Sequence, residues 1–196
     1  MNACRWIFAV CLAAFLGLPV AGAGAAEVAG VNVPESVKLG GADLLLNGAG
    51  IRTRVVFKVY VGALYVVERK KVAADLIGQR GPKRIALYML RDLSTEQFGG
   101  ALNDGLAANL TDGERQRFAG QIAELKATME AVGNAKEKSV VAIDFLPEIG
   151  VRIAVDGAQR GKNMGGEDFY RALMKIWLGD KPADDSLKAA MLGLAP

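Results

Sequence analysis

Histidine is absent from all 196 residues of the chain. This absence excludes Ser–His–Asp and Cys–His catalytic groups, histidine-bound zinc and imidazole proton transfer. Cysteine is nearly absent as well, because the chain's two cysteines, Cys4 and Cys11, both lie close to the start. The remaining sequence therefore needs no disulfide and offers no thiol chemistry. A net charge of only +3 also argues against nucleic-acid binding, which requires clustered basic residues.

The composition is that of an ordinary globular protein, with 52% hydrophobic and 23% charged residues. It excludes a disordered, collagen-like or coiled-coil chain, and the length suits one domain. None of the glycine-rich stretches has the spacing of a phosphate-binding loop. Asp104 and Asp112 are too far apart in sequence to form a metal site by themselves. We therefore expect neither a cofactor nor a bound metal.

Residues 1–25 have the pattern of a secretory signal peptide. Arg5 supplies the positive charge, residues 6–18 form an apolar run, and Ala23-Gly24-Ala25 matches a cleavage site. No other stretch approaches the length of a membrane span. The sequence thus predicts a single domain over residues 26–196 that is periplasmic or secreted, with a bacterial periplasm as the best fit, and has no transmembrane segment after cleavage.

Hydrophobic periodicity predicts an α+β domain with a mainly antiparallel sheet and helices layered on one side. Ser94 is an expected N-cap, and Gly62 is an expected bulge that divides the strongest strand signal in two. The expected strands are 43–47, 53–67, 85–90, 139–145, 149–155 and a short strand before Gly161, with a turn at 47–50. The expected helices begin near Ser94, Asp112 and Gly165-Gly166, and the last covers 185–192.

Four polar residues share even positions along the second expected strand: Arg52, Arg54, Lys58 and Tyr60. They can form a solvated outer face. Alternatively, a cation at the end of an apolar cleft suits an amphipathic carboxylate, because a guanidinium binds the head group and aliphatic side chains cover the tail. Without a ligand, a buried Arg52 is expected to meet water or to pair with Asp43 or Asp144.

Four segments, 47–52, 57–65, 83–98 and 169–192, resemble the chalcone isomerase superfamily, and in particular exported bacterial chalcone isomerase-like proteins. The last segment, with Ile176-Trp177-Leu178-Gly179-Asp180-Lys181-Pro182, carries most of the likeness. The resemblance implies an open-faced β-sandwich, in which helices pack over a large antiparallel sheet and leave a cleft between the two layers.

The resemblance also implies which positions correspond to the catalytic residues of the plant isomerases. Their arginine is matched by Arg52, whereas four polar positions are changed and fall on Tyr60, Phe98, Gly105 and Ile176. Removing one donor that stabilises the transition state costs about 3 kcal/mol, so little isomerase activity is expected. An arginine in a more apolar pocket is instead typical of the family's fatty-acid-binding members.

We therefore expect an exported, non-catalytic protein that binds a fatty acid or a similar amphipathic carboxylate. Its expected ligand-binding residues are Arg52, Tyr60, Phe98, Ile176 and Trp177, with Arg52 as the anchor. One alternative is an isomerase (an intramolecular lyase) with another small substrate. A second is a structural or partner-binding protein, for which the cleft would be filled by side chains.

Overall fold

The computed structural model describes residues 24–194. The predicted signal peptide, apart from residues 24 and 25, lies outside this part of the chain. Seven strands form one antiparallel sheet in the order β3-β4-β5-β6-β7-β8-β9, and β1 pairs with β2 in a separate hairpin. The strands are β1 (Ala25–Val28), β2 (Val31–Pro34), β3 (Ser36–Leu39), β4 (Ala42–Arg54), β5 (Phe57–Val66), β6 (Lys83–Met89), β7 (Val140–Leu146), β8 (Gly150–Val155) and β9 (Ala158–Met164).

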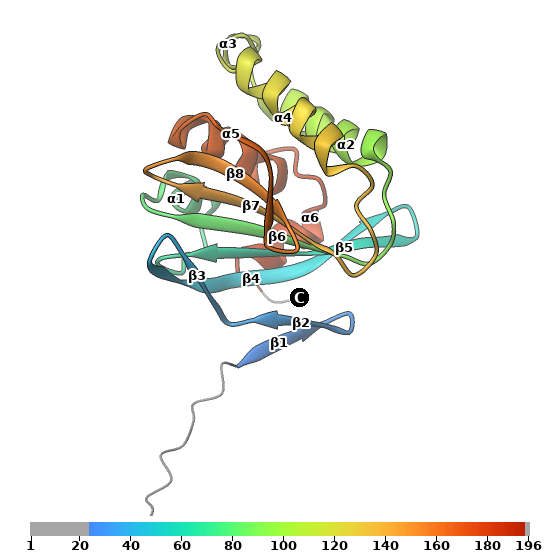
Figure 1. The fold of residues 1–196 in the computed structure, drawn as a ribbon. Helices are drawn as coiled ribbons and strands as arrows, with labels where there is room; N and C mark the ends of the chain where they lie inside the picture. Colours follow the sequence, from blue (N-terminus) through green and yellow to red (C-terminus); the bar gives the residue numbers. More distant parts are fainter. Residues whose placement is uncertain (1–23, 195–196) are drawn as a thin grey trace, which may run out of the picture.

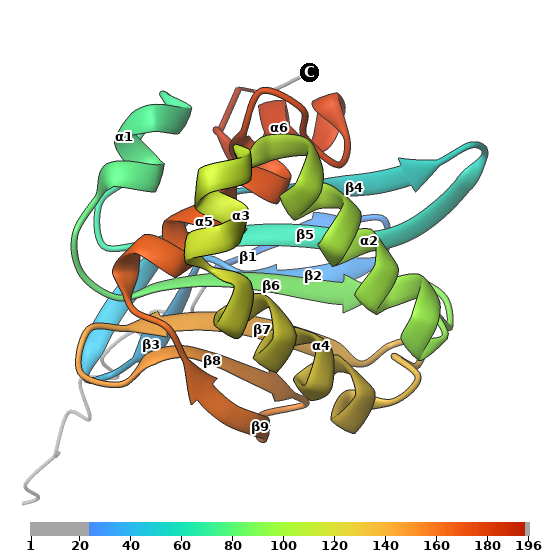
Figure 2. The same cartoon turned by 90° about the horizontal axis from the view of Figure 1, so that it is seen from above.

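Helices cover one face of the sheet, and the β1–β2 hairpin lies against the other face (Figure 1). In Figure 2, helices α2 and α4 run side by side over the seven-stranded sheet. Helices α5 and α6 cover the part of the sheet next to them. The helices are α1 (Ala73–Gly78), α2 (Thr95–Asn109), α3 (Asp112–Arg117), α4 (Ala119–Val132), α5 (Glu167–Leu178) and α6 (Asp185–Met191). The predicted α+β architecture, an antiparallel sheet with helices packed over it, is confirmed.

From Val59 to Val66, strand β5 is buried on both of its faces. Tyr60 and Leu64 point into the core under the helices, whereas Val61 and Tyr65 belong to a second core under the β1–β2 hairpin. The sequence pattern suggested one apolar and one mixed face, but the mixed face is the one that the helices cover. This strand therefore holds the two layers of the domain together.

Three predictions about the first strands were wrong. The expected turn at 47–50 lies inside β4, which continues to Arg54 with a register shift between Leu46 and Gly48. The strand expected over 53–67 is interrupted at Val55 and Val56, which form the turn between β4 and β5. Gly62 does not divide a strand, because it pairs regularly with its neighbours on β4 and β6.

These glycines are explained by helix α6, which packs onto β4 and β5. A Cβ atom on Gly48 would lie 2.0 Å from the carbonyl oxygen of Ala190, and one on Gly50 would lie 2.5 Å from the Ala190 Cβ. A Cβ on Gly62 would lie 2.8 Å from the Met191 side chain. The glycines thus permit close contact between α6 and the sheet. From the sequence alone the same glycines had suggested a turn and a bulge.

The helices follow the sequence signals more closely. Ser94 caps α2 in a capping box with Gln97, as its position predicted. The helix expected from Asp112 is divided at Phe118 into α3 and α4. The strands at 85–90, 139–145 and 149–155 are confirmed within one or two residues. The short strands β1 to β3 and the helix α1 were not predicted.

Candidate functional site

Arg52 and Tyr60 are direct cross-strand partners in β4 and β5, so both side chains lie on the face that the helices cover. The Arg52 guanidinium carbon lies 5.5 Å from the centre of the Tyr60 ring, a cation–π distance. The sequence placed them on one face by assuming a single unbroken strand. In the structure the hairpin between β4 and β5 brings them together instead.

Trp177 on α5 completes this group, which we call the Arg52 cluster (Arg52, Tyr60 and Trp177). Its indole Nε1 donates a hydrogen bond of 2.8 Å to the Tyr60 hydroxyl oxygen. Burial raises the pKa of Tyr60 above its usual value, although Arg52 and the indole donor oppose part of this rise. The phenol is therefore neutral near pH 7 and keeps its proton. Among the described residues it has no hydrogen-bond acceptor for that proton.

Arg52 also has a donor without an acceptor. Its Nε atom is buried and makes no hydrogen bond in the structure. No carboxylate of the described residues lies within 4 Å of its guanidinium. Asp184 comes near this region, but its two oxygens accept hydrogen bonds from the backbone nitrogens of Thr53 and Leu187, both at 2.9 Å. The cluster therefore presents donors that a carboxylate could accept.

The predicted pairing of Arg52 with Asp43 or Asp144 is wrong. Asp43 forms an exposed ion pair with Lys38 at 2.9 Å, near the opposite end of β4. Asp144 pairs with arginines on the two strands that flank β7. Asp144 lies directly opposite these arginines, on the sheet face away from the helices. It therefore cannot approach the side chain of Arg52.

The other predicted ligand-binding residues are packed in the helix-covered core. Phe98 on α2 and Ile176 on α5 are each 2% exposed. Helices α2 and α5 touch closely at this level, since a Cβ atom on Gly105 would lie 2.7 Å from a methyl group of Ile176. Tyr60, Phe98, Ile176 and Trp177 thus belong to the same buried core under the helices. Three of the five predicted residues form the Arg52 cluster.

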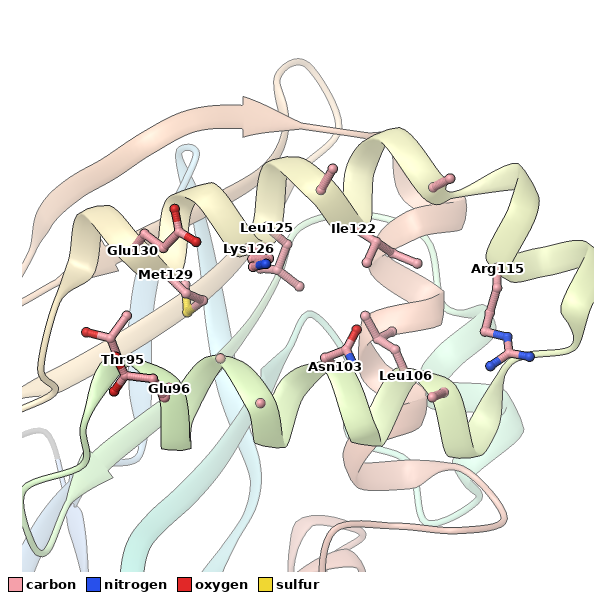
Figure 3. Close-up of a pocket in the computed structure, with 15 residues that line it drawn as sticks. Thr95, Glu96, Asn103, Leu106, Arg115, Ile122, Leu125, Lys126, Met129 and Glu130 are labelled. Carbon is pink, nitrogen blue, oxygen red and sulfur yellow. The ribbon is translucent and has the colours of Figure 1, made fainter.

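A cavity of about 750 Å³ lies elsewhere, between α2 and α4. Figure 3 shows side chains of both helices projecting into the space between them. Its lining is mainly apolar, and small residues on both helices leave the groove wide: Gly99, Gly100 and Ala107 on α2, and Ala119 and Ala123 on α4. Charged side chains occur along it, including Glu96, Arg115, Lys126 and Glu130.

Sequence reasoning did not find this cavity, although one signal was available. Glycine and alanine recur at helical spacing along the facing sides of α2 and α4. Within residues 24–194, no three metal-ligating side chains gather into a cluster. In the same part of the chain, no helix combines the length and apolarity required to cross a bilayer.

A seven-stranded antiparallel sheet covered on one face by helices, with an arginine–tyrosine pair at the boundary of the two layers, defines a layered α+β protein. The family model described as chalcone isomerase-like matches residues 25–193, so the chain belongs to the chalcone isomerase-like family. This confirms the family resemblance seen in the sequence.

Comparison with solved structures agrees with this assignment. The crystal structure of a fatty-acid binding protein of Arabidopsis thaliana matches with a TM-score of 0.64 and 14% sequence identity. The match covers 83% of this chain and 92% of the plant protein. Comparison with curated proteins gave no match. At this identity the structural likeness establishes the fold.

Proposed function

We propose that this protein binds a fatty acid or a similar amphipathic carboxylate at the Arg52 cluster. The carrying observation is that Arg52 Nε and the Tyr60 hydroxyl are neighbouring donors with no acceptor among the described residues. A carboxylate accepts several hydrogen bonds at once, and a guanidinium is its strongest neutral-pH partner. The fold shared with a plant fatty-acid binding protein supports the same ligand class.

We further propose that the protein is exported by the signal peptide at residues 1–25. The pattern that carries this proposal is the charged Arg5, the apolar run that follows it and the Ala23-Gly24-Ala25 cleavage sequence. The domain that remains contains no cysteine, which suits either a periplasmic or a secreted protein. Detection of a mature N-terminus at residue 26 by mass spectrometry would test the cleavage.

The acyl tail would lie under helix α2, beside Phe98. The side chains there pack against one another, so α2 must move away from the sheet for a tail to enter. Two glycines, Gly99 and Gly100, weaken this helix, each by about 1 kcal/mol relative to alanine. The cavity between α2 and α4 leaves space on the other side of α2. These features support α2 as the movable cover of the site.

The test is mass spectrometry of organic extracts from the purified protein, together with titration of a fluorescent fatty acid. Arg52→Ala should abolish both the copurified lipid and the titration signal, because it removes the anchoring charge. Arg54→Ala is the matched control, since Arg54 lies two residues further along β4 with an exposed side chain. Thermal unfolding of both variants would show that the fold is retained.

Unchanged affinity in Arg52→Ala would refute the anchor. Absence of any lipid and of any titration signal in the wild type would favour the partner-binding alternative, for which packed side chains fill the cleft. The isomerase alternative draws on the same donors, because Arg52 and a neutral Tyr60 could stabilise an oxyanion. Turnover of an enone or a related substrate that is lost in Tyr60→Phe would favour that activity.

A further inference from the structure

The turn between β4 and β5 carries an exposed apolar tip. Val55 is 90% exposed, Val56 is 77% exposed and Phe57, which follows the turn, is 56% exposed. Figures 1 and 2 both show this hairpin extending beyond the neighbouring strands of the sheet. Three consecutive exposed apolar residues at a projecting tip form a hydrophobic surface patch, a feature typical of sites that bind another protein or a membrane.

The backbone conformation of the β4–β5 turn is unfavourable for the valine at its first position. Val55 has a φ angle of +59°, in the left-handed region that β-branched residues avoid. It occupies the first position of a two-residue hairpin turn, where glycine is preferred when that residue alone has a positive φ. Folding alone would therefore favour Gly-Asn over Val55-Val56. The valines are better explained by what they contact than by the turn they form.

Positive charges surround the tip. Arg54 and Lys58 flank it on the two strands, and the Arg91 guanidinium lies 4.7 Å from the centre of the Phe57 ring. No acidic residue occurs in the sequence from 44 to 67. Two nearby carboxylates are already engaged, since Asp184 accepts backbone hydrogen bonds and Asp92 pairs with Lys136. An apolar tip with a basic rim is complementary to an anionic bilayer surface.

We propose that the β4–β5 hairpin docks this protein onto membranes that contain anionic phospholipid, with Val55, Val56 and Phe57 entering the interface. The Arg54, Lys58 and Arg91 side chains then lie at the level of the lipid phosphates. The Arg52–Tyr60 pair is close to this tip along the same hairpin, so docking also brings the Arg52 cluster close to the bilayer. Docking itself does not depend on the ligand proposed above.

The test is flotation of the purified protein with vesicles of phosphatidylcholine and phosphatidylglycerol. We expect the wild type to float with these vesicles and to bind pure phosphatidylcholine at least about fivefold more weakly, because each cation contributes near an anionic surface. Val55→Gly/Val56→Asn should lose binding by about tenfold or more, because it removes most of the apolar tip. Its melting temperature should equal or exceed that of the wild type, since the new turn relieves the positive φ.

Ile149→Asn is the matched control, because Ile149 is an exposed apolar residue in the turn between β7 and β8. It should float like the wild type. A Val56→Trp variant should show a blue shift of tryptophan emission on adding the mixed vesicles. Failure of the wild type to bind, or equal binding by Val55→Gly/Val56→Asn, would overturn the proposal. Equal binding to neutral vesicles would overturn the role assigned to the cations.

Discussion

Replacing Asp144 by asparagine should destabilise the domain strongly. Asp144 lies in the middle of the sheet with a fully buried side chain. Its oxygens accept hydrogen bonds from Arg84 Nε at 2.5 Å and Nη2 at 2.8 Å, and from Arg152 Nη2 at 2.8 Å. The substitution removes the negative charge and leaves two partly buried guanidinium groups without their counter-ion.

Breaking a buried ion pair by removing one partner costs about 3–5 kcal/mol. For a domain of this size each kcal/mol lowers the melting temperature by about 2–4 °C. We therefore expect Asp144→Asn to melt about 6–20 °C below the wild type in calorimetry or circular dichroism. The charge removed at Asp144, rather than a change of side-chain shape, is the cause of this loss.

Asp43→Asn is the control for this prediction, because its ion pair with Lys38 is exposed, with 69% of the Asp43 side chain accessible. That substitution should change the stability by less than about 1 kcal/mol. The triple variant Arg84→Met/Asp144→Leu/Arg152→Met should recover much of the lost stability, since it leaves no unpaired charge. A stability of Asp144→Asn within about 1 kcal/mol of the wild type would refute the reasoning.

Three further predictions concern pH and packing. Burial lowers the pKa of Lys83 to about 8, so the unfolded chain binds more protons above that pH. The free energy of unfolding should therefore gain a rising contribution between pH of about 8 and 10, and Lys83→Met should remove it in denaturant titrations. A hydrogen bond from a lysine on α5 helps to lower the pKa of Glu114 to about 2. The contribution of the Glu114 carboxylate to the free energy of unfolding should disappear as the pH falls from about 4.5 to about 2. Glu114→Gln should lower the free energy of unfolding by less than about 1 kcal/mol at neutral pH and should reduce its dependence on pH in this acid range. Gly48→Ala should cost about 1–3 kcal/mol in urea unfolding, because its Cβ would meet the Ala190 carbonyl oxygen. Gly120→Ala, where a Cβ meets no neighbour within 4 Å, should not destabilise the domain.

The Arg52 cluster shows which parts of the candidate site could be predicted from the sequence. Alternation along a strand predicted that Arg52 and Tyr60 share a face, and the family resemblance predicted that Trp177 approaches them. The structure brings all three together. It also shows Phe98 and Ile176 packed in the core, which the residue types alone did not distinguish from a cleft lining. Whether two helices close over a sheet depends on the fit of many side chains.

The sequence by itself determined the helix boundaries that have local signals, such as the Ser94 cap, and the family to which the chain belongs. Short-range periodicity and capping suffice there because the contacts involved are only a few residues apart. Only the tertiary structure decided that Gly48, Gly50 and Gly62 receive α6, because their close contacts come from residues more than a hundred positions away. The turn at Val55 was also decided only in the structure. The register of β4 on β5 gives Val55 a positive φ, which the local preference of valine opposes.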